Sequence, residues 1–215
     1  MAQPHHWERA RRQDQIEYRV QEILAATARL FDQHRYEDIS LSAIGQEAGF
    51  TRSNLYRYFS VKEDIFLRLL QTELSQWRAT LLAALARPEA EPASHAVCWL
   101  DSLFQYPRLL RLLTLLYTQL EPQASLEALC AFKQAIKAEM DQIALVLCQR
   151  GLLPDADAAS AFILSQLALM IGFYPLLELN DRQQTAMARA GMPLESALYR
   201  QMLTQATHAL LHAQR

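Results

Sequence analysis

Apolar residues recur at steps of three and four along most of this chain, which is the spacing of one face of an α-helix. The first stripe consists of Ile16, Val20, Ile23, Leu24, Thr27 and Phe31 and predicts a helix that starts near residue 15. The pattern breaks over residues 36–40, and two short helices are expected after it. Ser40 is expected to cap the first, over residues 41–48, and Gly49 to end it in a left-handed conformation. Thr51 is expected to cap the second, over residues 52–58.

Longer helices are expected from there to the end of the chain. Ser60 and Glu63 have the spacing of a capping box, in which each side chain satisfies a backbone N–H at the helix start, so a helix is predicted over residues 61–87. Five more are predicted over residues 93–106, 107–121, 124–150, 154–179 and 193–212. The prolines interpreted as first-turn residues, where a missing N–H costs nothing, are Pro107, Pro154 and Pro193. Gly151 is expected to end a helix, and the predicted fold class is all-α.

Residues 158–177 contain no charged side chain, and about 20 apolar residues suffice to span a bilayer. The polar or helix-breaking residues that interrupt the segment are Ser160, Ser165, Gln166 and Pro175. Acidic residues flank it in place of Lys or Arg, which fits the positive-inside pattern poorly. We therefore interpret it as a helix covered on both faces, one inside its own subunit and the other against a second subunit, and expect no membrane contact.

Composition supports the helical prediction and narrows the possible functions. Hydrophobic residues make up 51% of the 215 positions, while Gly and Pro number only 5 and 8. The net charge of −2 excludes a global basic surface, so a nucleic-acid surface must be local. Three cysteines without a CxxC pair suit a reducing cytosol. Because the polar first 12 residues lack the apolar stretch of a secretory signal, a cytoplasmic protein is expected.

Three segments near the start of the chain carry a resemblance to a known family. They are ILAATARLF at residues 23–31, IGQEAGF at 44–50, and LYRYF at 55–59 followed by Lys62 and Glu63. In this order and spacing they resemble the N-terminal domain of the TetR family of transcriptional regulators, over about residues 15–70. A tight turn at residues 49–51 between two short helices fits a helix-turn-helix. The family often has glycine at the position of Arg35, so either Arg35 is strained or the first helix ends differently.

The resemblance implies a division of the chain into three parts. Residues 1–14 would be a flexible basic arm, residues 15–62 a three-helix helix-turn-helix DNA-binding domain, and residues 63–215 a helical bundle for effector binding and dimerisation. The arginines that could take the arm into a minor groove are Arg9, Arg11, Arg12 and Arg19. A solvated terminus is the alternative for this segment.

The expected DNA contacts lie around the second short helix. Arg can bind guanine and Asn adenine through paired hydrogen bonds in the major groove, and residues 49–62 contain three basic residues and no acidic one. By resemblance, the residues facing bases are Arg52, Ser53, Asn54 and Arg57. Those contacting mainly phosphates are Ser42, Tyr56, Tyr58 and Lys62, with Thr51 at the edge. The partner expected from this set is double-stranded DNA carrying an inverted repeat.

The remaining helices are expected to bind an apolar or aromatic small molecule and to form a homodimer. The candidate pocket residues are Trp77, His95, Trp99, Phe104, Tyr117, Phe132, Met140, Phe173 and Tyr174. The same aromatic residues at helical spacing also suit an ordinary core. By resemblance, residues 155–179 and 193–212 pair with their copies in a four-helix bundle. The candidate interface residues are Phe162, Leu169, Leu194, Leu198 and Leu210.

Catalytic and metal-dependent functions find little support in the sequence. His95 and Cys98 lie three apart, but nothing orients the histidine. His208 and His212 have the spacing of two metal ligands but lack a third. We therefore predict no enzyme, no metal and no cofactor, and a repressor that a small molecule releases from DNA. A regulator without an effector, an activator, and a helical-bundle enzyme or binding protein are the alternatives.

Overall fold

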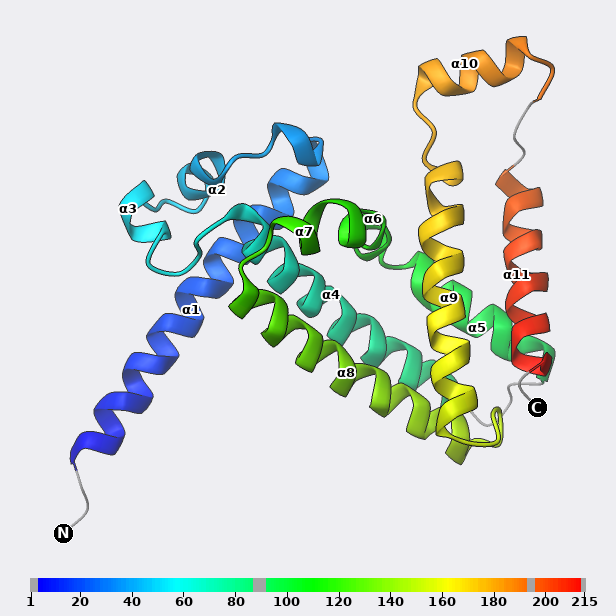
Figure 1. The fold of residues 1–215 in the computed structure, drawn as a ribbon, viewed down its shortest axis with the longest axis horizontal. Helices are drawn as coiled ribbons and strands as arrows, with labels where there is room; N and C mark the ends of the chain where they lie inside the picture. Colours follow the sequence, from blue (N-terminus) through cyan, green and yellow to red (C-terminus); the bar gives the residue numbers. More distant parts are fainter. Residues whose placement is uncertain (1–3, 87–91, 193–195, 214–215) are drawn as a thin grey trace. The chain divides into compact units, whose positions relative to one another are not determined.

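The computed structural model describes residues 4–86, 92–192 and 196–213, and every regular element within those ranges is helical (Figure 1). The first part of the chain contains α1 (Pro4–Gln33), the 3-10 turn η1 (Tyr36–Asp38), α2 (Leu41–Glu47), α3 (Arg52–Leu55) and α4 (Lys62–Leu85). The middle part contains α5 (Pro92–Phe104), α6 (Pro107–Leu115), the π-helical η2 (Leu116–Leu120), α7 (Glu121–Gln123) and α8 (Leu126–Gln149). The last part contains α9 (Ala156–Leu177), α10 (Asp181–Arg189) and α11 (Ser196–Ala213).

The chain forms two compact units, and each takes residues from separate segments. The first unit comprises Met1–Leu69 and Gln119–Phe132, and the second comprises Leu70–Thr118 and Lys133–Arg215. Helices α4 and α8 therefore each contribute residues to both units. The sequence predicted a single boundary near residue 62 and did not predict that residues 119–132 return to the first unit.

Helix α1 starts earlier than predicted. It begins at Pro4, so residues 4–14, expected as an arm ahead of the first helix, belong to the helix itself. Pro4 suits a first helical turn, and no glycine or further proline interrupts the residues that follow it. At the other end α1 stops at Gln33, and Arg35 has extended backbone angles, φ −72° and ψ 149°. Arg35 is therefore unstrained, because the first helix ends before it.

The core of the first unit is built from aromatic and branched side chains of α1, α2, α3 and α4. The ring of Phe66 meets those of Phe31 and Tyr36 edge-on, at centroid distances of 5.4 and 5.1 Å. Ile44 and Leu55, on the two short helices, are fully buried. The unit thus holds these helices through apolar anchors, since helices of this length are not stable alone.

The helix caps in this region confirm the sequence prediction. Ser40 Oγ accepts a hydrogen bond from the Ala43 N–H at 3.1 Å, and Thr51 Oγ1 accepts one from the Asn54 N–H at 3.3 Å. Gly49 ends α2 with φ +73°. Helix α3, however, is shorter than predicted, because the chain tightens after Leu55 and the Tyr58 N–H bonds to the Leu55 carbonyl at 2.9 Å.

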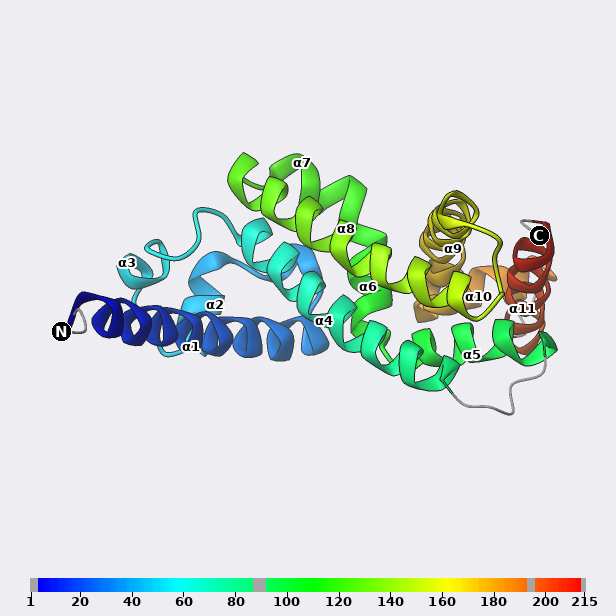
Figure 2. The same ribbon diagram turned by 90° about the horizontal axis from the view of Figure 1, so that it is seen from below.

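The second unit packs α9 against α6 and α11, and α5 against α6 and α11. Both views show α5 running beside α11 (Figures 1 and 2). Helix α10 bridges α9 and α11 in the chain and was not predicted. Its start is fixed by a capping box between Asn180 and Gln183. The helix has no buried residue, so it leaves no apolar stripe for the sequence to reveal.

Three prolines were expected in first helical turns, with different outcomes. Pro107 stands at the first turn of α6, as predicted. Pro154 does not open α9, because Asp155 is the N-cap and its carboxylate accepts from the Ala158 N–H at 2.9 Å. Pro193 lies outside the described residues. Gly151, with φ +66°, ends α8 as predicted.

Helix α9 is long and apolar enough to cross a membrane by length and composition alone, and it is the one such helix among the described residues. Its inner face is buried within the unit, including Phe162, Gln166 and Met170. Part of its remaining surface is not covered by the subunit, and Leu176 is 40% exposed. The structure therefore confirms that one face of α9 is buried within its own subunit. Burial of the other face against a second subunit stays a prediction.

Candidate nucleic-acid interface and ligand pocket

Helices α2 and α3 are locked together by a close turn. The Phe50 N–H donates to the Gly45 carbonyl at 2.8 Å. A Cβ atom at Gly45 would lie 3.4 Å from both the Leu55 side chain and the Phe50 carbonyl, so the two helices meet tightly at this glycine. Leu55 is fully buried and anchors α3. The opposite face of α3 is consequently held in a fixed orientation relative to α2.

That opposite face presents polar side chains to solvent. Arg52, Ser53 and Asn54 are all exposed, and they occupy the first three positions of α3. The other exposed residues among the predicted contacts are Ser42, Thr51, Tyr56 and Arg57. The first residues of the second helix of a helix-turn-helix are those that reach base edges. The structure therefore leaves these candidates exposed, and all of them except Ser42 lie on α3 or directly beside it in the chain.

Arg52 is held by its neighbour one turn along. Its Nη2 donates to the Tyr56 hydroxyl at 3.3 Å, and its guanidinium lies 5.6 Å from the centre of the Tyr56 ring. The hydrogen bond to Tyr56 raises the pKa of Arg52. The side chain thus keeps its charge and is supported by an aromatic face that is itself 47% exposed.

A second basic group lies beside α3. A surface hollow of about 190 Å³ is lined by Arg19, Gly49, Phe50, Asn54, Arg57 and Tyr58. Arg19 comes from α1, forms an ion pair with Glu22 at 2.8 Å and lies 5.6 Å from the centre of the Phe50 ring. Tyr58 is half-buried, with its ring edge-on to Phe50. Two guanidinium groups and an amide therefore surround a space suited to an anion such as a phosphate.

Sequence reasoning placed Arg19 with the arm and did not connect it to α3. The connection depends on how α1 packs against α2, which no local pattern reveals. The basic residues Arg9, Arg11 and Arg12 precede the first described side chain, so the structure does not locate their charges.

Lys62 occupies a different environment from the one expected. Its ammonium donates to the carbonyls of Tyr36 and Ile39 at 3.1 and 2.9 Å and lies 4.0 Å from the centre of the Tyr36 ring. Two of its three donors therefore satisfy backbone at the end of η1. Glu63, expected to complete a capping box, instead accepts the Tyr36 hydroxyl at 2.6 Å. Both residues join α4 to η1, which supports the base of the helix-turn-helix.

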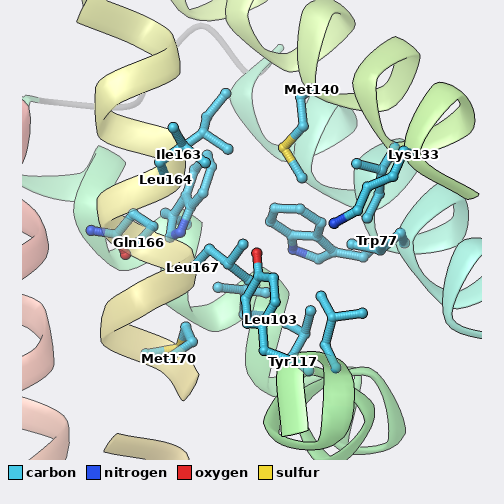
Figure 3. A pocket seen from close by; sticks show the side chains of 15 residues that line it. Trp77, Leu103, Tyr117, Lys133, Met140, Ile163, Leu164, Gln166, Leu167 and Met170 are labelled. Carbon is cyan, nitrogen blue, oxygen red and sulfur yellow. The ribbon is translucent and has the colours of Figure 1, made fainter. Parts of the chain in front are cut away.

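The second unit contains an apolar pocket of about 210 Å³ (Figure 3). Four of the predicted pocket residues line it, namely Trp77, Trp99, Tyr117 and Met140. Lys133 and Gln166 also line it and were not predicted, because no sequence pattern marks a polar residue that faces a cavity. In Figure 3 the Tyr117 hydroxyl and the Met140 thioether point into the space from different helices.

The other five predicted pocket residues do not line this cavity. Phe104 and Tyr174 border a separate cleft of about 350 Å³. Phe132 is buried in the first unit. Phe173 lies edge-on to Tyr199, with ring centroids 6.3 Å apart. His95 is half-buried on α5, and its Nδ1 has no partner among the described residues. Their place in an effector site stays a prediction, because helical spacing shows that a residue faces inward but not which space it meets.

The predicted interface residues differ in how far they are exposed in the single chain. Phe162 is fully buried with its ring 4.9 Å from Trp99, so it cannot reach another subunit and its prediction is wrong. Leu198 is 52% exposed, while Leu169 and Leu210 are half-buried in the single chain. Leu194 lies outside the described residues. Met202 on α11 is 42% exposed and was not predicted.

Histidine and cysteine side chains do not assemble into a metal site in the part of the chain that the structure describes. No group of three or more His, Cys, Asp or Glu residues there could hold an ion. His208 and His212 approach each other at 3.1 Å between their Nε2 atoms and form an exposed pair at the end of α11.

Two family profiles match the chain. One, described as bacterial regulatory proteins of the tetR family, covers residues 23–69, and the other, described as a tetracyclin repressor-like C-terminal domain, covers residues 71–212. A curated relative from Bacillus subtilis, the uncharacterized HTH-type transcriptional regulator YfiR, is 34% identical over 58 residues, which are 27% of this chain and 28% of that protein.

Two solved structures share the fold at low identity. The fatty acid degradation regulator FadR from Bacillus halodurans is 15% identical, with a TM-score of 0.58 over 90% of this chain and 94% of that one. The TetR family transcriptional regulator PfmR from Thermus thermophilus is 19% identical, with a TM-score of 0.53 over 88% of this chain and 97% of that one.

Proposed function

Because the chain belongs to the TetR family of bacterial transcriptional regulators, we propose that it is a homodimeric repressor that a small apolar molecule releases from an inverted-repeat operator. The observation that carries this proposal is the polar face of α3, where Arg52, Ser53 and Asn54 are exposed above a buried Leu55. Residues 15–62 would read DNA, and residues 63–215 would bind the effector and form the dimer, in the cytoplasm where the chromosome lies.

In this proposal the contacts on DNA divide by chemistry. Arg52 and Asn54 would contact base edges in the major groove, where paired hydrogen bonds distinguish guanine and adenine. Arg19 and Arg57 would hold a phosphate at the hollow that they line with Asn54. Lys62 would act mainly through η1, since its ammonium already serves two carbonyls.

The dimer would form through the outer faces of α9 and α11. Leu176, Leu198 and Met202 are each at least 40% exposed in the single chain. Exposed apolar groups gathered on neighbouring helices are typical of an interface between subunits. A two-fold dimer presents two copies of α3, which is why the operator would be an inverted repeat.

Release would follow from a shift between two conformations of the dimer. A ligand favours the conformation that binds it better, and it weakens DNA binding if that conformation holds the two α3 helices at the wrong spacing. Trp77 of α4 lines the pocket, and Glu63 of the same helix bonds to Tyr36 in the first unit. Helix α4 would therefore carry the change.

Selection of bound duplexes from a random DNA pool tests the proposal directly. We expect an inverted repeat with half-sites about one helical turn apart, roughly 34–36 Å between centres. Enrichment of no sequence, or of a single unrepeated site, would contradict it. Transcription in vitro from a promoter carrying the selected site should fall when the protein is added. Increased transcription would show an activator instead.

A further inference from the structure

The pocket of the second unit has an apolar interior. Its deeper wall includes Trp77 of α4, Leu103 of α5 and Met170 of α9, each at most 4% exposed. Its volume of about 210 Å³ exceeds that of an apolar cavity of about 150 Å³, which binds benzene. An apolar body of about one ring with a short chain would therefore fit.

Three lining residues are exposed and mark where the pocket opens to solvent. Tyr117 of η2 is 51% exposed, Leu164 of α9 is 64% exposed, and Lys133 of α8 is also exposed. Because these residues come from three elements, the opening lies between η2, α8 and α9. A ligand in the pocket would therefore bury its body and keep one end near water.

Two polar groups at this opening point into the pocket. Figure 3 shows the Lys133 ammonium and the Tyr117 hydroxyl directed toward the middle of the space from different elements. The ammonium lies 5.5 Å from the centre of the Tyr117 ring, so the two groups lie on the same side of the pocket. Among the described residues that line the pocket, Lys133 is the only one with a charge, and none is acidic.

The chemistry of these two groups indicates which end of a ligand fits at the opening. An ammonium has three N–H donors, so Lys133 can bind an acceptor in the pocket in addition to its contacts within the protein. A carboxylate has two oxygens and can accept from Lys133 and Tyr117 together. Near solvent it also keeps part of its hydration, which avoids the penalty of burying an ion. A cationic end would be repelled by Lys133.

We propose that the effector is an apolar molecule of about one ring that ends in a carboxylate. Its body would lie among the buried side chains of the pocket, and its carboxylate would accept hydrogen bonds from Lys133 and Tyr117 at the opening. This inference rests on the proposed function, because it specifies the effector at the same pocket.

Three probes with a similar phenylalkyl body test the charged end, namely 4-phenylbutyrate, 4-phenylbutyramide and 4-phenylbutylamine. Calorimetric titration of the full-length protein at neutral pH measures the affinity for each. The acid should bind about two- to fivefold more tightly than the amide, the effect of one partly exposed ion pair. The amine should bind more weakly than the amide. Added salt should reduce the preference for the acid, because it screens exposed charges.

Matched variants on α8 locate the carboxylate. Lys133→Met keeps the apolar stem and removes the charge, so it should abolish the preference for the acid over the amide. The control is Lys137→Met, one turn along the same helix, where the ammonium pairs with Asp141 at 2.6 Å and does not line the pocket. This control should retain the preference. Tyr117→Phe should weaken the acid more than the amide, because a hydrogen bond to a charged acceptor is the stronger one.

Several outcomes would overturn the inference. Equal binding of the acid and the amide, or a preference that Lys133→Met retains, would show that the carboxylate does not meet Lys133. Tightest binding of the amine would show that the pocket selects a cation, and no binding by any probe would exclude this ligand class. If the operator is still bound with two-fold symmetry in these cases, the proposed regulator stands and only the effector chemistry fails.

Discussion

Tyr36 and Glu63 form a buried hydrogen bond of 2.6 Å that joins η1 to the start of α4. Replacing Tyr36 by Phe would leave the carboxylate of Glu63, which is 6% exposed, without this donor. A hydrogen bond to a charged group contributes about 1.5–3 kcal/mol, so Tyr36→Phe should lower the free energy of unfolding by that amount near neutral pH. Urea denaturation of both proteins measures the difference. An unchanged midpoint would show that Glu63 finds another donor.

The same pair predicts a loss of stability in alkali. Burial, followed by the hydrogen bond to Glu63, raises the pKa of Tyr36 above its ordinary value of 10.0. The folded protein therefore keeps a proton that the unfolded chain releases, and the stabilisation is present below pH 10 and lost as the pH rises further. Unfolding followed at increasing pH should show a decline that is smaller in Tyr36→Phe. Parallel declines would place the alkaline effect elsewhere.

Arg52 should determine sequence preference. Arg52→Ala removes the exposed guanidinium at the first position of α3 and should weaken binding to the selected site about tenfold to a hundredfold, with relaxed preference at one base position. Arg189→Ala, on α10 of the second unit, is the matched control for loss of one charge. A selected-site profile that Arg52→Ala leaves unchanged would remove this residue from the base contacts.

Residue-level features were predictable where the signal is local. The caps Ser40 and Thr51 and the left-handed Gly49 each depend on a few neighbouring positions, and the structure confirms them. The surroundings of Lys62 and Phe162 were not predictable because their partners, Tyr36 and Trp99, are distant in the sequence. Spacing along the chain carries no information on such contacts.

At the scale of elements, α11 provides the clearest test of the proposed dimer. Leu198→Glu places a charge on the exposed apolar face of α11 and should split the dimer without loss of helicity, because Leu198 is 52% exposed in the single chain. Light scattering should then report a mass near 24.6 kDa. The control is Leu145→Glu on α8, where a leucine is 57% exposed. Loss of helicity in Leu198→Glu would mean that this face supports the subunit itself.

Helical periodicity predicted most of the long elements and failed on the irregular ones. The continuous segment predicted over residues 107–121 is broken into α6, the π-helical η2 and the start of α7. A π-helical turn is rare and often occurs at functional sites, and here it carries Tyr117 of the pocket. Its wider turn changes the register without changing the apolar content, so no pattern in the sequence reveals it.

At the scale of the whole molecule, the effector and the operator should each weaken the binding of the other by the same factor. Coupling between two sites is typically about 1–3 kcal/mol, so a saturating effector should weaken operator binding roughly 5–150-fold. Saturating operator DNA must then weaken effector binding by the same factor, which titrations with each ligand in the presence of the other measure. A compound that binds without changing operator affinity would contradict release by an effector.

A larger side chain in the pocket should reduce the response to the effector without changing operator binding. Met140 lines the cavity, and Met140→Trp should reduce the response to the effector while operator affinity in its absence stays nearly the same. Gel mobility-shift titrations of operator DNA, with and without effector, measure the operator affinity and its change on effector binding. A variant that loses operator binding in the absence of effector would show that the substitution itself shifts the conformation.

If α9 forms the proposed dimer interface, its outer face would also link the lifetime of the protein to its abundance. Residues 158–177 carry no charge and Leu176 is 40% exposed, so an unpaired subunit would expose an apolar surface to chaperones and proteases. Dimerisation would cover this surface, and by mass action a smaller fraction of subunits would be paired as the number of copies falls. Newly made chains would be degraded fastest when they are scarcest. The level of the regulator in a cell would therefore rise with synthesis as a threshold, not in simple proportion.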